Sequence, residues 1–521
     1  MAAVCTQLIC YLCLMNTPRH GRFISKETVA LTGFIILKFA LQAVLIHPVY
    51  ELHRDEFLYI DQANHLAWGY VSVPPVTSWI SSVIKLLGNS VFWVKFFPAL
   101  FGALTLFVVW KTIAALGGNF FARLLGATCV LFSALLRLNT LYQPNSLDVL
   151  SWTAVYAVVA LYLRSENSRW LYVGAVVFAI GFLNKYNIVF LLIGLLPAIL
   201  LTPTRKMLTK KACYGVMALA ILLVLPNLAW QYRHDFPVTK HLRELSETQL
   251  VHVDRWGFLT AQLLFFFGSL PVIAAGLYAL WRFPKLAKYR AFFWAFFATL
   301  ATFIFFRAKD YYAIGLYPIY IAFGSVYLGR VLGKGWKRHL RPVLVAVPVL
   351  FFIPMYQFAF PNKPPAVIVE RGQQHRWEDG KDHALPQDYA DMQGWKELAY
   401  KVDRLYAGLS EPQKTLVLCD NYGQAGAINY YTTEGIRAVA FSGDYINWFD
   451  LDTPYTHLIR VKNASGAAGE LAETSPYFRE ARKADSVTNR FARERGTAIF
   501  VFTGARIDIS RRIATELAGE D

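Results

Sequence analysis

Residues 91–114 read VFWVKFFPALFGALTLFVVWKTIA, and this stretch decides the class of the protein. It is predominantly apolar and long enough to cross a bilayer, which takes about 20 such residues. Similar stretches recur along the chain, so the pattern predicts a polytopic α-helical membrane protein. We predict eleven spans, at residues 28–47, 91–114, 120–138, 147–163, 170–184, 187–202, 212–230, 257–281, 291–306, 312–330 and 341–358.

The composition agrees with this class. The 521 residues are 55% hydrophobic and 17% charged, whereas soluble domains carry about 25% charged residues. A net charge of +17 would also suit a nucleic-acid-binding protein. Here, however, the basic residues form short clusters between apolar runs, which is the pattern of topology signals and lipid-headgroup contacts. We therefore expect membrane lipids as partners, and no nucleic acid.

The loops between the predicted spans alternate in charge. Those on the side of the N-terminus carry most of the basic residues, for example Arg205, Lys206, Lys210 and Lys211. The positive-inside rule makes that side cytoplasmic, and an odd number of spans puts the C-terminus outside. We expect a multi-pass protein of the inner (plasma) membrane with a periplasmic or extracellular C-terminal domain.

Three domains are expected. Residues 1–27 form a cytoplasmic N-terminal segment, residues 28–360 the transmembrane domain, and residues 361–521 a small external α/β domain. The last is predicted from a helical pattern at 394–409 and from short β-type runs at 415–419, 438–442, 457–461 and 498–503. The apolar start of the chain is short for a span, and we interpret it as an interfacial segment or an upstream-start extension. The six cysteines have no disulfide or zinc-site spacing.

The first external loop carries an acid pair, Asp55-Glu56. Residues 55–70 and 76–87, joined by Pro74-Pro75, predict two short amphipathic helices lying in the membrane interface. An acid pair at the membrane surface suits catalysis. Acids at a helix N-terminus also cap the helix and complement its dipole, so both interpretations stand.

Further candidates lie at external ends of spans. Asp148 has the same two interpretations, catalysis or helix capping. The cations Lys185, Arg307 and Lys309 suit a phosphate at the outer interface, or else lipid headgroups beside a belt of tyrosines. Lys38 lies within the first span, where a charge is either functional or faces the bundle and snorkels. No Gly-rich phosphate loop, G-x-S-x-G or H-E-x-x-H motif occurs in the sequence.

The order of these motifs resembles the GT-C class of polyprenyl-phosphate-sugar glycosyltransferases. It is most similar to the family 39-like branch, which is related to protein O-mannosyltransferases and lipid A aminoarabinose transferases. The resemblance covers about residues 28–450. Its motifs are Asp55-Glu56 with Tyr59, Gly69-Tyr70 and Pro74-Pro75, Gln143-Pro144 with Asp148, Asn184-Lys185-Tyr186, Lys309-x-Tyr311-Tyr312 with Pro318, and residues 421–427.

The resemblance implies a GT-C fold and an inverting transfer of a sugar from a polyprenyl-phosphate donor to an acceptor hydroxyl on the external face. The acceptor is lipid A, a cell-envelope glycan or a protein. Asp55 would be the general base, with Glu56 and Asp148 orienting the acceptor or holding a sugar hydroxyl. The implied donor-phosphate ligands are Lys85, Lys185, Arg307 and Lys309, and the implied substrate-binding residues are Tyr59, His65, Tyr311 and Tyr312.

The sequence departs from the family at one phosphate contact. Many relatives carry a basic residue just before the proline pair, where this chain has Val73, so Lys85 or Lys185 would supply that contact. No cofactor is expected, because a polyprenyl phosphate is a good leaving group once cations stabilise its charge. A divalent cation held by Glu56 and Asp148 is the alternative.

Two other function classes are alternatives to a glycosyltransferase. A lipid or sugar transporter or flippase tends to show internal repeats and polar sites near the membrane midplane. Here the charged candidates gather at external ends of spans. A non-catalytic assembly factor would instead bind partners through the external domain.

Overall fold

The computed structural model describes residues 25–248 and 253–519, which form two compact units. Unit 1 comprises the chain up to Leu45, Lys95–Thr140 and Pro144–Phe360. Unit 2 comprises Ile46–Val94, Leu141–Gln143 and the chain from Pro361 onward. The first loop thus groups with the C-terminal region, although sequence analysis had placed it in the transmembrane domain. The domain boundaries stay a prediction, and the N-terminal apolar segment lies outside the described residues.

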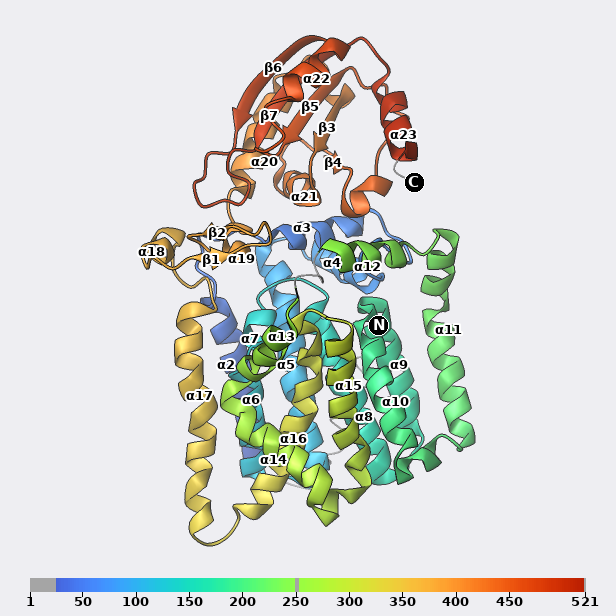
Figure 1. Ribbon diagram of the computed structural model, residues 1–521, viewed down its shortest axis with the longest axis vertical. Helices are drawn as coiled ribbons and strands as arrows, with labels where there is room; N and C mark the ends of the chain where they lie inside the picture. Colours follow the sequence, from blue (N-terminus) through green and yellow to red (C-terminus); the bar gives the residue numbers. More distant parts are fainter. Residues whose placement is uncertain (1–24, 249–252, 520–521) are drawn as a thin grey trace. The chain divides into compact units, whose positions relative to one another are not determined.

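Unit 1 is helical (Figure 1). Its helices are α2 (Lys26–Val44), α5 (Val91–Ala115), α6 (Phe120–Leu131), α7 (Leu135–Leu138), α8 (Asn145–Ser165), α9 (Arg169–Asn184), α10 (Val189–Leu200), α11 (Lys211–Arg233), α12 (Pro237–Thr248), α13 (Arg255–Phe265), α14 (Leu270–Arg282), α15 (Arg290–Phe305), α16 (Tyr317–Val331) and α17 (Leu340–Phe358). Helix α8 packs on α9, α10 on α15, and α14 on α16.

The polytopic helical class is confirmed, but the number of spans is not. Six helices in the described ranges are long and apolar enough to cross a membrane, or up to seven if the bent pair α13–α14 is one span. That pair bends by 67°, so the predicted span 257–281 is not one straight helix. The predicted span 120–138 is also broken, between α6 and α7. The count of eleven therefore stays a prediction.

Small residues allow close helix packing in unit 1. A side chain at Gly276 of α14 would clash with the carbonyl oxygen of Tyr320, and one at Gly324 of α16 with that of Val272. Such small-residue contacts let helix backbones approach each other where no hydrophobic force draws them together in lipid. The close packing of α14 on α16 therefore depends on the absence of a side chain at Gly276 and Gly324.

Unit 2 contains a five-stranded mixed sheet of order β4-β3-β5-β7-β6. Strand β3 is parallel to both β4 and β5, whereas β7 is antiparallel to β5 and β6. The strands are β3 (Thr415–Cys419), β4 (Val439–Ala440), β5 (His457–Lys462), β6 (Phe478–Ser486) and β7 (Ala498–Ala505), with a separate hairpin of β1 (His375–Arg376) and β2 (Asp382–His383). The helices are α3 (Arg54–Asp61), α4 (Val76–Leu86), α18 (Pro365–Val369), α19 (Gln387–Ala390), α20 (Trp395–Ala407), α21 (Tyr422–Tyr431), α22 (Glu470–Thr474) and α23 (Ile509–Gly519).

The first predicted interfacial helix is shorter than expected. Helix α3 ends at Asp61 and is followed by one 3₁₀ turn, Gln62–Asn64, rather than continuing to residue 70. The hydroxyl of Tyr70 donates to the carbonyl oxygens of Gln62 at 3.2 Å and His65 at 3.0 Å. These carbonyls would bond the next helical turn if the helix continued. The second predicted helix is present as α4.

Helix α3 packs against α20 and α21 within unit 2. The ring of Phe57 lies 5.8 Å from that of Trp395 and 5.7 Å from that of Tyr430, centroid to centroid. A Cβ atom at Gly426 of α21 would lie 2.7 Å from the Cβ of Phe57. The aromatic cluster and this glycine together hold α3, with its acid pair, on the C-terminal part of the unit.

Candidate active site

Glu56 is fully buried, and its carboxylate accepts hydrogen bonds from two backbone N–H groups. Its Oε2 atom accepts the N–H of His53 at 2.7 Å, while the side chain of His53 accepts the N–H of Asp55 at 3.2 Å. This reciprocal pair is a capping box. The other oxygen, Oε1, accepts the N–H of Tyr142 at 2.7 Å. The geometry therefore shows Glu56 capping α3, and its catalytic role stays a prediction.

Asp55 is more accessible, with 30% of its side chain exposed. Its Oδ1 atom accepts the hydroxyl of Tyr422 at 2.7 Å, and Oδ2 accepts the side-chain amide of Gln143 at 3.0 Å. Burial and the neighbouring Asp55 carboxylate raise the pKa of Tyr422 well above its ordinary value, so the phenol stays a donor. Asp55 is thus an oriented carboxylate that solvent or a substrate can still reach.

A polar cavity of about 390 Å³ lies beside this helix in unit 2. Arg54, Arg493 and Arg495 line it, with Asn421, Asn463 and the buried carboxylate of Glu494. Those two asparagines follow the parallel neighbouring strands β3 and β5. The next strand after β3 lies on one side of this pair in the sheet, and the next strand after β5 lies on the other. Open α/β sheets bind ligands at such a switch point. The buried Arg54 Nε atom has no hydrogen-bond partner within the described residues.

The three arginines are not equally available. Nη1 of Arg493 lies 3.1 Å from Oδ2 of the buried Asp391, in an ion pair. The guanidinium of Arg54 stacks over the ring of Tyr422 at 4.6 Å from its centroid. Arg495 is exposed and makes no ion pair with any described residue. The carboxylates of Asp55, Asp391 and Glu494 also act on the charge of Arg54. An anion entering this cavity would therefore meet Arg495 first.

Two further carboxylates of unit 2 were missed by the sequence analysis. Asp61 accepts hydrogen bonds from the hydroxyl of Tyr445 and the amide of Asn429, both at 2.7 Å. Asp444 accepts the amide of Gln62 at 2.8 Å and the N–H of Val71 at 2.6 Å. Burial raises the pKa of Asp444 to about 6. These acids hold the end of α3 and the segment after it.

The other predicted residues of unit 2 have distinct surroundings. Lys85 donates to Asn64, whose amide donates to Asp61 Oδ1 at 2.5 Å. The ring of His65 stacks on that of Trp448, with centroids 4.2 Å apart and planes 8° from parallel. The carbonyl oxygen of Tyr59 accepts the hydroxyl of Ser81 at 2.6 Å.

Unit 1 brings Asp148 close to the predicted residue Tyr312, through the side chain of Asn187. Oδ2 of Asp148 accepts the amide of Asn187 at 2.7 Å, and the same amide lies 3.1 Å from the carbonyl oxygen of Tyr312. Oδ1 of Asp148 is buried without a hydrogen-bond partner in the described part of the chain. Asn187 was not predicted, although it directly follows the motif Asn184-Lys185-Tyr186.

Lys185 is the central cation of unit 1. Its Nζ atom donates to Asn145 Oδ1 at 2.7 Å and lies 4.2 Å from the ring centroid of Tyr312 and 5.2 Å from that of Tyr311. Lys185 also interacts electrostatically with the acidic side chain of Asp148, which attracts it, and with the cation Lys309, which repels it.

Arg307 and Lys38 have different surroundings from this cluster. Arg307 is exposed and has a φ of 49°, in the left-handed region that non-glycine residues seldom adopt. Lys38 is buried on α2 and donates to Gln42 at 2.5 Å, as a bundle-facing lysine would.

The predicted site residues therefore fall into two groups. Unit 2 holds Asp55, Glu56, Tyr59, His65 and Lys85, and unit 1 holds Asp148, Lys185, Arg307, Lys309, Tyr311 and Tyr312. Within residues 25–248 and 253–519, no three His, Cys, Asp or Glu side chains gather in a way that could hold a metal ion. The catalytic and binding roles of these residues stay predictions.

Comparisons with known proteins agree with the resemblance seen in the motifs. A family profile described as dolichyl-phosphate-mannose-protein mannosyltransferase matches residues 72–230. Over 220 residues the chain is 26% identical to the lipid A galacturonosyltransferase RgtD of Rhizobium johnstonii, covering 41% of this chain and 46% of that protein. The chain thus matches less than half the length of that relative.

Solved structures show the fold. The crystal structure of ArnT from Cupriavidus metallidurans in the apo state has a TM-score of 0.60 at 11% identity, covering 92% of this chain and 98% of that one. The same protein bound to undecaprenyl phosphate has a TM-score of 0.59. The archaeal oligosaccharyltransferase AglB from Archaeoglobus fulgidus has a TM-score of 0.54 at 9% identity, covering 84% of this chain and 69% of that one. Together with the family profile and the relative, these matches confirm the GT-C resemblance and the membrane-protein fold.

Proposed function

We propose that the protein is a glycosyltransferase that moves a sugar from a polyprenyl-phosphate donor to an acceptor hydroxyl on the external face of the membrane, with inversion. The supporting observation is the oriented but accessible carboxylate of Asp55, held by Tyr422 and Gln143. Asp55 takes the proton of the acceptor hydroxyl as the oxygen attacks the anomeric carbon. General-base help of this kind is worth about 10²–10⁴-fold in rate.

The leaving group is the polyprenyl phosphate, and it needs cations rather than an acid. Its bond to the anomeric carbon breaks as the acceptor bond forms, so one displacement inverts the configuration. We assign the stabilisation of the developing phosphate charge to Lys185 and Lys309, with Arg307 as a further contact. Lys185 is suited to this role because Asn145 and the rings of Tyr311 and Tyr312 fix its position.

The acceptor is proposed to carry anionic groups. The relative from Rhizobium johnstonii is named for lipid A. In the polar cavity beside α3, the exposed Arg495 makes no ion pair with any described residue, so it is suited to a phosphate or carboxylate. A phosphorylated glycolipid of the lipid A type is therefore our first choice of acceptor. A protein hydroxyl is second, because the matching family profile is named for protein mannosylation.

The decisive experiment follows release of free polyprenyl phosphate. Purified protein in nanodiscs is given a panel of polyprenyl-phosphate sugars and a membrane-extract acceptor, and wild type is compared with Asp55→Asn. The matched control is Asp452→Asn, an exposed acid of unit 2 outside the site. We expect release by wild type and by the control, and loss of release in Asp55→Asn. Equal release by all three proteins would remove Asp55 from the reaction.

A negative result with every donor would move the function toward transport of the lipid-linked sugar. Labelled acceptor then separates the remaining alternatives, because the label enters either a glycolipid or a protein fraction. Lys185→Gln serves as a second probe of the donor side. It should raise the donor KM about tenfold through loss of one charge-assisted contact to phosphate, whereas the exposed Lys285→Gln should not.

A further inference from the structure

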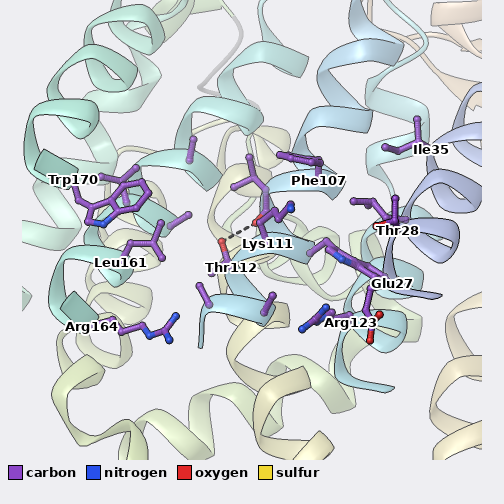
Figure 2. A pocket seen from close by; sticks show the side chains of 18 of the residues that line it. Glu27, Thr28, Ile35, Phe107, Lys111, Thr112, Arg123, Leu161, Arg164 and Trp170 are labelled. Carbon is purple, nitrogen blue, oxygen red and sulfur yellow. Dashed lines mark hydrogen bonds between the residues drawn. The ribbon is translucent and has the colours of Figure 1, made fainter. Parts of the chain in front are cut away.

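A second pocket opens in unit 1, away from the residues assigned above. It has a volume of about 600 Å³ and is lined by parts of α2, α5, α6, α8 and α9. Figure 2 shows Arg164 and Trp170 on one side of it, Glu27 and Arg123 on the other, and Lys111 between them. Arg164 lies in the last turn of α8 and Asp148 in its first, so about 24 Å of helix separates them at about 1.5 Å per residue.

The polar end of this pocket is cationic. Lys111, Arg123 and Arg164 line it with a single carboxylate, that of Glu27. None of the four makes an ion pair with another described residue. The buried Nε of Arg123 has no hydrogen-bond partner within the described ranges, and Lys111 Nζ lies 5.4 Å from the ring centroid of Phe107. Lys111 and Arg123 are half-buried without a carboxylate partner among the described residues, which is unfavourable, and Arg164 is an exposed cation beside them. These groups are therefore suited to an anion from outside the chain.

The other end of the pocket is apolar. Leu31 and Ile35 of α2 line it together with Phe107 of α5 and Leu161 of α8. Helix α2 is poorly covered by protein, since only 6% of its apolar window is buried inside the structure. The pocket therefore has cations without ion-pair partners at one end and apolar side chains at the other. It lies along α2, a helix whose apolar surface is left for lipid to cover.

We propose that this pocket binds an anionic glycerophospholipid. Its phosphate would lie among Lys111, Arg123 and Arg164, and its acyl chains would run along α2 and α8. Basic pockets between transmembrane helices bind anionic headgroups in this way. The pocket contains none of the residues assigned to sugar transfer, so the proposal is independent of the proposed function. Inorganic phosphate shares the headgroup chemistry but lacks the chains that the apolar wall requires.

The test compares three probes on purified protein in a neutral detergent. Phosphatidylglycerol, phosphatidylcholine with the same acyl chains, and inorganic phosphate are each added, and retained lipid is measured by native mass spectrometry beside the unfolding temperature. We expect wild type to retain phosphatidylglycerol over phosphatidylcholine and to be stabilised by it, with no effect of phosphate. The double variant Lys111→Gln/Arg123→Gln should lower the preference about tenfold, and Lys285→Gln should leave it unchanged.

Four results would overturn the proposal. Equal retention of the two lipids would show that charge plays no part, and stabilisation by phosphate alone would assign the site to a free anion. An unchanged preference in the double variant would place the lipid elsewhere. If that variant does not fold, Thr32→Trp keeps every cation and fills the pocket from an exposed position of α2. It should remove the preference, and retention of the preference there would also overturn the proposal.

Discussion

The hydroxyl of Tyr422 donates a 2.7 Å hydrogen bond to Asp55, across 367 positions of sequence. Tyr422 is the first residue of α21 and Asp55 lies in the first turn of α3. The bond therefore couples the orientation of the proposed base to the packing of two helices within unit 2.

Removing the hydroxyl in Tyr422→Phe should lower turnover about tenfold, because a hydrogen bond to a charged group contributes about 1.5–3 kcal/mol. The ring would remain in place under Arg54, so the fold should be kept. Release of polyprenyl phosphate per folded molecule is the measurement. Tyr445→Phe is the matched control, since its hydroxyl bonds to Asp61 of the same helix instead. Equal losses in both variants would argue for a general effect on α3.

Replacing Glu56 should affect stability before chemistry. A glutamine can accept only one of the two N–H groups that Glu56 accepts, so one buried N–H is left unpaired at a cost of about 1–3 kcal/mol. We expect a lower unfolding temperature for Glu56→Gln and no such change for Glu434→Gln, an exposed acid of the same unit. Loss of turnover with unchanged stability would instead support the predicted catalytic role of Glu56.

Gly426→Ala should destabilise unit 2 by about 1–3 kcal/mol, because the new methyl would lie 2.7 Å from Phe57 Cβ and from the Tyr445 hydroxyl. In an open helical position the same change is neutral or favourable. Gly519→Ala at the end of α23 meets no atom within 4 Å and is the control. Unfolding in denaturant gives the comparison, and equal stability of the two variants would contradict the close packing of α21 on α3.

Asp444 should give unit 2 a pH dependence. Its pKa is about 6 in the folded protein, above the ordinary value of about 3.9, so the folded state binds the proton more tightly. Stability should therefore fall as the pH rises from about 4 to about 6, by at most about 3 kcal/mol, and then level off. Asp444→Asn should remove this slope. Unfolding temperatures of both proteins between pH 4 and 7 test it, and parallel curves would contradict it.

The proposed binding of the donor phosphate is tested at Lys185 and Lys309. These two lysines of unit 1 lie close enough for their charges to interact. If both contact one phosphate, the double variant Lys185→Gln/Lys309→Gln should raise the donor KM by less than the product of the single effects, because neighbouring contacts are not additive. Strictly multiplicative effects would indicate that the two cations act on separate groups. Initial rates over a range of donor concentrations provide all three values.

The sequence predicted unit 1 better than unit 2. A long apolar run is by itself sufficient to indicate a helix in a membrane. The breaks between α6 and α7 and within α13–α14 were missed because hydropathy carries no information on bends. In unit 2 the short helix α3 was predicted too long, since the contacts of Tyr70 that end it are not visible in the periodicity.

Two elements of unit 2 were missed for identifiable reasons. Strand β6 reads FREARKADS, an edge strand rich in charge, which discourages edge-to-edge pairing but hides the alternating apolar pattern of a strand. Helix α21 reads YGQAGAINYY, and its glycines disfavour a helix by propensity. In the folded protein this helix packs on α3, and the missing side chain of Gly426 leaves room for Phe57 at that contact. The motif at 421–427 was noticed, but no role for Tyr422 could be read from it, because its partner is 367 positions away.

Unit 2 combines an early segment of the chain with its C-terminal region, and this affects the order in which the unit can fold during synthesis. At a synthesis rate of about 5–20 residues per second, roughly 20–70 s pass between the emergence of Asp55 and that of Tyr422. During this delay α3 lacks the helices α20 and α21 that cover Phe57. The proposed base is therefore one of the first parts of the protein to be synthesised and one of the last to reach its final geometry. A fragment ending before Pro361 would contain every predicted span yet leave Asp55 permanently at that unfinished stage.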